Sequence, residues 1–260
     1  MTLYDTIGKT YARTRNSDRR IATKLLEILP GLQGSTIADI GAGTGSYAIV
    51  LAEQGCQVIA VEPSQTMRSQ APTHFAIQWI DAYADNIPLP DQSVDAAIIM
   101  LAFHHFQNYQ RSLQEICRIT KNGQIVLFTF DPAFASQFWL TKYFPSFIKD
   151  VELTFLPILE LKAEIQSVTN NVFNVLPFPL PHDLADSFAA VGWGRPELYL
   201  DRTIRDGISS FAKINSDELN TGLSQLQRDL ETGVWDQQYG YLRQQDQYDA
   251  GYCFVYSSVA

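Results

Sequence analysis

Short apolar runs alternate with amphipathic segments along the first half of the chain. The apolar runs are rich in alanine, valine and isoleucine, and each has the length of a buried strand. They cover residues 36–40, 57–62, 76–80, 94–100 and 124–130. Between them, apolar positions at helical spacing predict helices at 18–29, 46–54 and 109–120, and another that begins at Pro63-Ser64. Strands that alternate with helices predict one parallel sheet, covered by helices on both faces.

The second half of the chain has a less regular pattern. We predict a helix at 182–191, a strand at 197–200 and an amphipathic helix at 216–230 with Ser216 as its N-cap. Residues 252–259 predict a final strand. Together with the first half, these elements predict an α/β fold with a seven-stranded, mostly parallel sheet.

Two segments, 131–181 and 205–250, are longer than the connections within a sheet usually are. We predict that they form a mainly helical cap. The remaining residues, 1–130, 182–204 and 251–260, would then form the core domain. No second domain with its own sheet is expected.

Composition and charge exclude several classes of partner. The 260 residues carry a formal net charge of -9, whereas nucleic acids and anionic membranes require a positive face. No stretch of about 20 apolar residues is present, so we expect no integral membrane segment. The three cysteines form no C-x-x-C pair and no secretory signal is evident, which favours a reducing cytoplasm. We expect no bound metal, and a monomer or weak dimer.

The segment Asp39-Ile40-Gly41-Ala42-Gly43-Thr44-Gly45 is a glycine-rich turn between a predicted strand and a predicted helix. Without a Cβ, its glycines let a ligand approach the backbone, and the turn points the free N–H groups of the helix toward that ligand. Glu62 follows the next strand, where a carboxylate can hold both hydroxyls of a ribose. Together these two features predict a nucleoside-containing cofactor.

The spacing of the glycines narrows the choice of cofactor. A dinucleotide fingerprint that began at Gly41 would place its third glycine at position 46, where this chain has Ser46. The turn, Glu62 and the later pair Asp81-Ala82 resemble the motifs of class I S-adenosylmethionine-dependent methyltransferases. Residues 39–130 resemble more narrowly the branch that contains the ubiquinone and menaquinone C-methyltransferases and many small-molecule methyltransferases. The resemblance implies a Rossmann-like fold with the last strand antiparallel, and an enzyme that converts S-adenosyl-L-methionine to S-adenosyl-L-homocysteine.

The resemblance also implies which residues bind the cofactor. The backbone of Gly41 to Gly43 would lie beside its methionine part, and Glu62 would hold the ribose hydroxyls. Asp81 would accept a hydrogen bond from the adenine amino group, or else only cap a turn. The implied residues come from the N-terminal segment, the glycine-rich turn and the ends of the following strands: Tyr11, Asp39, Gly41, Ala42, Gly43, Gly45, Glu62, Asp81, Ala82 and Leu101.

His104 and His105 follow the fourth predicted strand, at the edge where parallel sheets bind ligands. Either histidine could act as a catalytic base on a hydroxyl or amine, because histidine titrates near neutrality. Methyl transfer alternatively needs only the alignment of nucleophile, methyl carbon and sulfur, since the sulfonium is already a good leaving group. Both histidines are candidate catalytic residues, with His104 the first choice.

The acceptor expected from these features is a small, partly apolar molecule. No Asp/Asn-Pro-Pro-Tyr/Phe motif and no Pro-Cys nucleophile is present, which disfavours a nucleic-acid base. The predicted cap is rich in aromatic residues between 134 and 178, which either line a substrate pocket or form the core of the cap. Arg15 or Arg205 could pair with a substrate carboxylate, or be a surface charge.

Two other functions remain open on the sequence. A nicotinamide-dependent oxidoreductase could use the same glycine-rich turn and Glu62, although Ser46 and the Asp81-Ala82 pair speak against it. A non-catalytic protein could also bind adenosylmethionine without transferring its methyl group.

Overall fold

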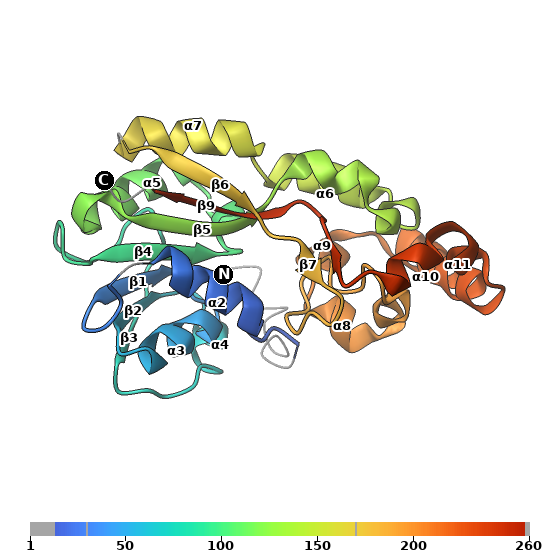
Figure 1. The fold of residues 1–260 in the computed structure, drawn as a ribbon, viewed down its shortest axis with the longest axis horizontal. Coiled ribbons are helices and arrows are strands. Elements are labelled where there is room, and N and C mark those ends of the chain that lie inside the picture. Colours follow the sequence, from blue (N-terminus) through green and yellow to red (C-terminus); the bar gives the residue numbers. More distant parts are fainter. Residues whose placement is uncertain (1–13, 30, 170, 258–260) are drawn as a thin grey trace.

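A seven-stranded sheet runs through the described part of the molecule (Figure 1). The computed structural model describes residues 14–29, 31–169 and 171–257. The strands are β1 (Thr36–Ile40), β2 (Gln57–Val61), β3 (Ile77–Ile80), β4 (Ala96–Met100), β5 (Ile125–Phe130), β6 (Phe173–Pro177) and β9 (Tyr252–Ser257). Their order is β3-β2-β1-β4-β5-β9-β6. Among these strands, β9 runs opposite to the other six, and it pairs antiparallel with both β5 and β6. The predicted mostly parallel sheet, with its last strand antiparallel, is confirmed.

Helices cover both faces of the sheet, and each face has its own apolar core. The helices of this half are α2 (Arg19–Ile28), α3 (Ser46–Glu53), α4 (Gln65–Arg68), α5 (Tyr109–Ile119), η3 (Lys121–Gly123) and α7 (Ile158–Thr169). One core joins α2 and α3 to Val126 and Phe128, and the other joins α5 and α7 to Leu127. Neighbouring residues of β5 thus alternate between the two cores, as in a strand buried on both faces. The helices predicted at 18–29, 46–54 and 109–120 are confirmed.

The sixth strand of the sheet is not the one that we predicted. Residues 197–200 lie in a 3₁₀ helix, η6 (Pro196–Leu200), and β6 takes the expected place in the sheet. Proline at the start of η6 has no N–H to give to a strand, and its fixed φ suits a helical turn. The Tyr199 hydroxyl donates to the Ala189 carbonyl at 2.7 Å and accepts from the Gly192 amide at 3.1 Å, which fixes the turn.

The helix predicted at 182–191 is also wrong, because this segment forms a series of turns. Two of its amide groups bond to distant parts of the chain instead of continuing a helix. The Ser187 amide donates to the Thr14 carbonyl, and the Ala185 amide donates to the Asp18 carboxylate, both at 3.0 Å. These two bonds fasten the segment to Thr14 and to the N-cap of α2.

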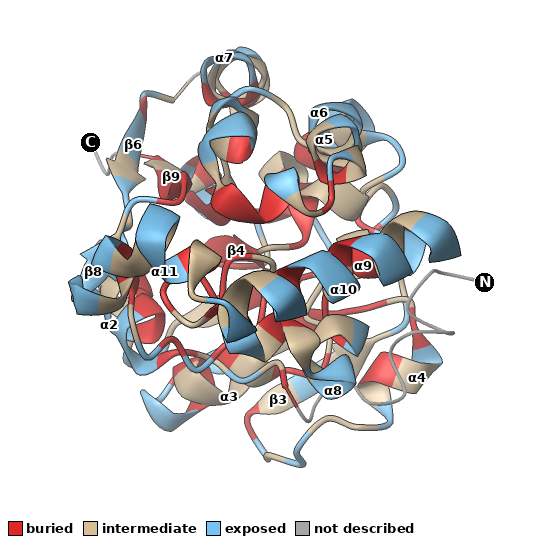
Figure 2. Cartoon of the chain, turned by 90° about the vertical axis from the view of Figure 1, so that its right-hand side faces the viewer, coloured by how far each residue is buried: buried red, intermediate tan, exposed pale blue. Residues whose placement is uncertain are grey.

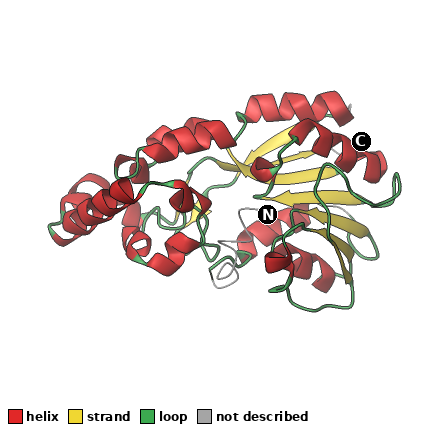
Figure 3. Cartoon of the chain, turned by 180° about the vertical axis from the view of Figure 1, so that it is seen from behind, coloured by secondary structure: helices red, strands yellow, loops and turns green. Residues whose placement is uncertain are grey.

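Helical segments extend beyond the carboxyl ends of the parallel strands (Figures 1 and 3). Besides η6 they are η4 (Pro132–Gln137), η5 (Trp139–Lys142), α6 (Ser146–Thr154), α8 (Arg202–Asp206), α9 (Ser209–Lys213), α10 (Ser216–Glu231), α11 (Val234–Tyr239) and η7 (Gly240–Gln244). A two-stranded ladder of β7 (Leu180–Pro181) and β8 (Gln247–Tyr248) adjoins them. The helix expected at 216–230 is confirmed as α10, but Asn215 is its N-cap instead of Ser216.

The helices of this end are exposed on their outer side and buried on the inner side (Figure 2). Trp139, Trp193 and Trp235 are buried there, and they belong to the same core as α2 and α3. The division into a core and a cap stays a prediction. Two elements within the range 131–181 belong with the sheet, since β6 pairs with β9 and α7 packs on α5. Over the described ranges, no helix has the length and apolar character needed to cross a membrane.

Candidate functional site

The glycine-rich turn connects β1 to α3 in a conformation that requires glycine. Gly41 and Gly43 have φ angles of 72° and 58°, in the left-handed region that other residues rarely adopt. A Cβ on Gly41 would also lie 2.6 Å from the Cβ of Ala102. The turn therefore packs its backbone against the loop that follows β4, and any side chain at Gly41 would push the two apart.

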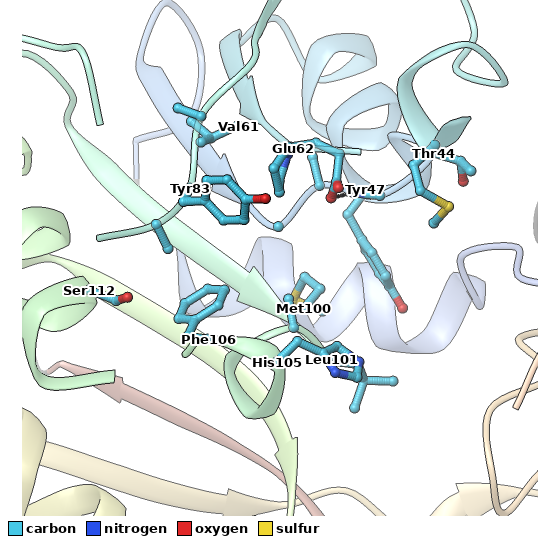
Figure 4. Close-up of a pocket in the computed structure, with 18 of the residues that line it drawn as sticks. Thr44, Tyr47, Val61, Glu62, Tyr83, Met100, Leu101, His105, Phe106 and Ser112 are labelled. Carbon is cyan, nitrogen blue, oxygen red and sulfur yellow. Dashed lines mark hydrogen bonds between the residues drawn. The ribbon is translucent and has the colours of Figure 1, made fainter. Parts of the chain in front are cut away.

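A cavity of about 550 Å³ opens above this turn (Figure 4). Its wall comes from the glycine-rich turn, the loops after β2, β3 and β4, and Arg15 and Asp186 from outside this half of the sheet. Several predicted site residues meet in it, and these are Gly41, Ala42, Gly43, Glu62, Ala82, Leu101 and His105. The cavity lies at the carboxyl edge of the parallel strands, where open α/β sheets bind their ligands.

Glu62 is the best-positioned carboxylate of the cavity. It is 7% exposed, and its two oxygens accept hydrogen bonds from the amides of Gly43 at 3.0 Å and Ser64 at 2.9 Å. Each carboxylate oxygen can accept more than one hydrogen bond, so both can still accept from a ligand. The side chain is thus fixed in direction while it keeps acceptor capacity toward the cavity.

Other predicted cofactor residues do not line the cavity as described. Asp39 is buried beneath the turn, where burial and then the charge of Glu62 raise its pKa to about 7. Gly45 caps α3 and packs against the ring of Trp79. The Asp81 side chain is 69% exposed and forms an ion pair with Arg68 at 2.7 Å. Tyr11 lies outside the described residues. The binding roles of these four residues stay predictions.

Sequence reasoning missed several residues of the same wall. Tyr83, two positions after Asp81, points its ring toward Glu62, and the Tyr47 ring extends into the space below it (Figure 4). The Tyr47 hydroxyl is buried and has no hydrogen-bond partner among the described residues. Tyr83 directly follows the predicted pair Asp81-Ala82, and Tyr47 lies two positions after the glycine-rich turn, and that proximity was the available signal. Asp186 had no such signal, since it lies in a segment expected to be helical.

A second, smaller cavity of about 90 Å³ adjoins the first, and Arg15, Leu101 and His105 line both. Leu101 has a φ of 51°, which is a strained conformation for a leucine, at the sharp turn that ends β4. His104 lines only the second cavity, among the described residues. The remaining wall is mostly apolar and aromatic, and comes from β5, η4 to α6, the segment 188–190, α9 and β9.

The two histidines are packed together between the cavities. Their ring centroids are 3.9 Å apart, and the ring of His104 stacks on Phe155 at 4.2 Å. Burial lowers the pKa of His104 well below its usual value, and burial followed by the charge of Lys213 lowers the pKa of His105 to about 4. Both side chains are therefore neutral at pH 7.

The two arginines suggested as partners for a substrate carboxylate are both engaged within the protein. Arg15 forms an ion pair with Asp186, whose side chain is 4% exposed, and burial raises the pKa of that carboxyl while Arg15 opposes the rise. Arg205 donates to the Tyr199 carbonyl at 2.6 Å and lines neither cavity as described. Within the described ranges, no three acidic, histidine or cysteine side chains group to hold a metal ion.

Known proteins resemble the chain both over this site and over its full length. The sequence profile of a family described as "Methyltransferase domain" matches residues 38–128. The solved structure of an Anabaena variabilis ATCC 29413 protein, assigned as a methyltransferase from an antibiotic biosynthesis pathway, is 47% identical. That match covers 95% of this chain and 99% of the other, with a TM-score of 0.91.

Two curated relatives extend this comparison. The biotin biosynthesis bifunctional protein BioHC of Cellvibrio japonicus is 33% identical over 44% of this chain, but the match spans only 23% of that protein. The demethylmenaquinone methyltransferase of Corynebacterium urealyticum is 26% identical over 74% of this chain and 84% of its own length.

Proposed function

Since the chain belongs to the class I S-adenosylmethionine-dependent methyltransferases, we propose that it methylates a small, partly apolar molecule held in the second cavity. The observation that carries this proposal is the pair of adjoining cavities. The larger one is built around a glycine-rich turn and Glu62, and the smaller one is mostly apolar. Membership of this family removes the oxidoreductase that the glycine-rich turn alone left open.

The larger cavity fits S-adenosylmethionine in size and chemistry. Its volume of about 550 Å³ is that of a small-molecule or cofactor site. The backbone of Gly41 to Gly43 lines this cavity and would lie beside the methionine part, and Glu62 would accept from the ribose hydroxyls. We assign the adenine end to the Ala82 backbone and Tyr83, because Asp81 pairs with Arg68 and does not line the cavity as described.

When bound, S-adenosylmethionine supplies a methyl group on a sulfonium centre, which a correctly aligned nucleophile displaces. The chain's own contribution is to place the acceptor and to exclude water. Residues from η4 to α6 and from α9 line the second cavity, and we assign the exclusion of competing water to their apolar side chains. Leu101 and His105, which line both cavities, stand where donor and acceptor meet.

The proposal is tested by filling the second cavity. Ala189 lines it, so Ala189→Phe should abolish methyl transfer while S-adenosylhomocysteine binds within about two-fold of wild type. Ala163→Phe, on the exposed face of α7, is the matched control and should keep full activity. Activity is measured with an isotopically labelled methyl donor and a metabolite extract, followed by mass spectrometry. Full labelling by Ala189→Phe would place the acceptor elsewhere.

A further inference from the structure

The second cavity is walled by aromatic rings in mutual contact. Phe130 meets Phe155 edge to face with ring centroids 5.5 Å apart, and Tyr252 lies 5.2 Å from Phe130 and 4.6 Å from Phe188. All four rings line the cavity. A single water needs about 10–15 Å³ of such space, so about 90 Å³ accepts one ring with a few substituents. Aromatic walls of this kind add stacking and edge-to-face contacts to the burial of a planar ligand.

The charges around this cavity are balanced within the protein. Among the described residues that line it, Arg15 is the sole formally charged side chain, and Asp186 neutralises it. Lys213, the other cation that acts on the histidines, forms an ion pair with Asp150 at 2.7 Å. An anion or a cation that entered would lose its hydration and find no unmatched counter-charge, so the cavity disfavours charged ligands.

His104 presents one polar atom to this apolar space. Its Nδ1 is buried and has no hydrogen-bond partner among the described residues. Nε2, unlike Nδ1, is not fully buried, and it makes no hydrogen bond to the described residues. The ring itself lines the cavity. Nε2 is therefore the nitrogen that has access to the cavity. A proton on Nδ1 would be a buried donor without an acceptor, so the neutral ring carries its proton on Nε2.

We propose that the methyl acceptor is an uncharged aromatic molecule, held among these rings with one of its oxygen atoms accepting a hydrogen bond from Nε2 of His104. The inference rests on the proposed function, in that it names the class of molecule that the second cavity takes. His104 is then a group that orients the acceptor. Arg15 and Asp186 act as a neutral pair that discriminates against charged acceptors.

The class of ligand is tested on the full chain saturated with S-adenosylhomocysteine. Calorimetry with phenol, toluene, benzoate and benzylammonium should show that phenol binds, and that benzoate and benzylammonium bind at least ten-fold more weakly. If either charged probe binds as tightly as phenol, or if no aromatic probe binds, this inference is overturned. S-adenosylhomocysteine binding is measured first, and its absence would sink the proposed function instead.

The role of His104 is tested with His104→Phe, which keeps a ring beside Phe155 but removes both nitrogens. Phenol affinity should fall about five- to ten-fold, the effect of one neutral hydrogen bond, while toluene affinity stays the same. An equal loss for both probes would mean that His104 only packs, and would overturn its assigned role.

The charge argument is tested with Asp186→Asn, which leaves the Arg15 charge without its carboxylate. Benzoate should then bind at least ten-fold more tightly than to wild type, and phenol should bind equally well. Near-ultraviolet circular dichroism shows whether this variant folds. If it does not, Asp150→Asn is used in its place, because it leaves the Lys213 charge without its carboxylate, and benzoate should again bind more tightly than to wild type. Unchanged benzoate binding in the folded variant would contradict the role of the ion pair.

Discussion

The carboxylate of Glu62 is oriented by two backbone amides, those of Gly43 and Ser64, which is why this residue differs from an ordinary acid at a strand end. A carboxylate that is already fixed in direction loses little conformational entropy when a ligand binds. Asp81 is the opposite case, since its exposed side chain forms an ion pair with Arg68. The two acids that the sequence singled out thus differ in how much they can contribute.

Glu62→Ala should lower the affinity for S-adenosylhomocysteine by about 1.5–3 kcal/mol, the range for hydrogen bonds to a charged group. Asp81→Ala should lower it less than three-fold, because its side chain faces away from the cavity. Both affinities are measured by calorimetry, with circular dichroism to verify folding. Equal losses in the two variants would show that Asp81 turns inward to hold the adenine.

The elements of the first half follow closely from the sequence, and those of the second half do not. Buried strands such as β4 consist of apolar residues alone, so their pattern is unambiguous. β6 is an edge strand with a single buried residue, Phe173. A segment of the predicted cap could have the same pattern of apolar and polar residues, so the sequence did not identify this strand. Residues 182–191 have apolar positions at helical spacing, but the amides of Ala185 and Ser187 bond to Asp18 and Thr14, and no local pattern reveals such distant partners.

The same distinction applies to the site. The glycine-rich turn and Glu62 are local motifs with a known physical use, so both could be predicted. The partner of Arg15 is 171 residues away in the chain, so Asp186 could not be predicted. Arg15 consequently looked like a group for a substrate carboxylate, whereas the fold neutralises it.

Asp18 joins α2 to the segment 183–187. It is 1% exposed, caps α2 by accepting from the Arg20 amide at 2.9 Å, and accepts from the Ala185 amide at 3.0 Å. Asp18→Ala should lower the free energy of unfolding by about 2–4 kcal/mol, since it removes a helix cap and the charged acceptor of the Arg20 and Ala185 amides. Urea unfolding measures the loss. The control Asp183→Ala removes only an exposed partner of Arg20 and should leave the midpoint of urea unfolding almost unchanged.

For the molecule as a whole, the buried histidines link stability to pH. The pKa of His105 is lowered to about 4 in the folded chain, from a usual value of 6.5. The unfolded chain therefore gains a proton at His105 as the pH falls through 6.5, and the folded chain does not until about 4. The stability present above pH 6.5 is lost over this interval. The raised pKa of Asp39 acts in the opposite direction, so the total profile mixes both effects.

A comparison of variants isolates the contribution of His105. When the pH falls from 7.5 to 5, His105→Asn should lose about 2 kcal/mol less unfolding free energy than wild type. The reason is that the wild type loses about 1.4 kcal/mol for each pH unit below 6.5 through His105. Urea unfolding at the two pH values gives the difference. A constant offset between the two proteins, independent of pH, would show that His105 titrates normally in the folded chain.

Most of the larger cavity comes from the chain before residue 113, whereas much of the second cavity comes from residues after 129. The matched methyltransferase profile ends at residue 128, close to this division. Substitutions after residue 129 can therefore change the lining of the second cavity, and with it the molecule that this cavity accepts, while most of the lining of the larger cavity stays the same. Asp186 is an exception, because it belongs to the later segment but lines the larger cavity, where it pairs with Arg15, a residue that lines both cavities. Descendants that adopted a charged acceptor would be expected to change this pair first.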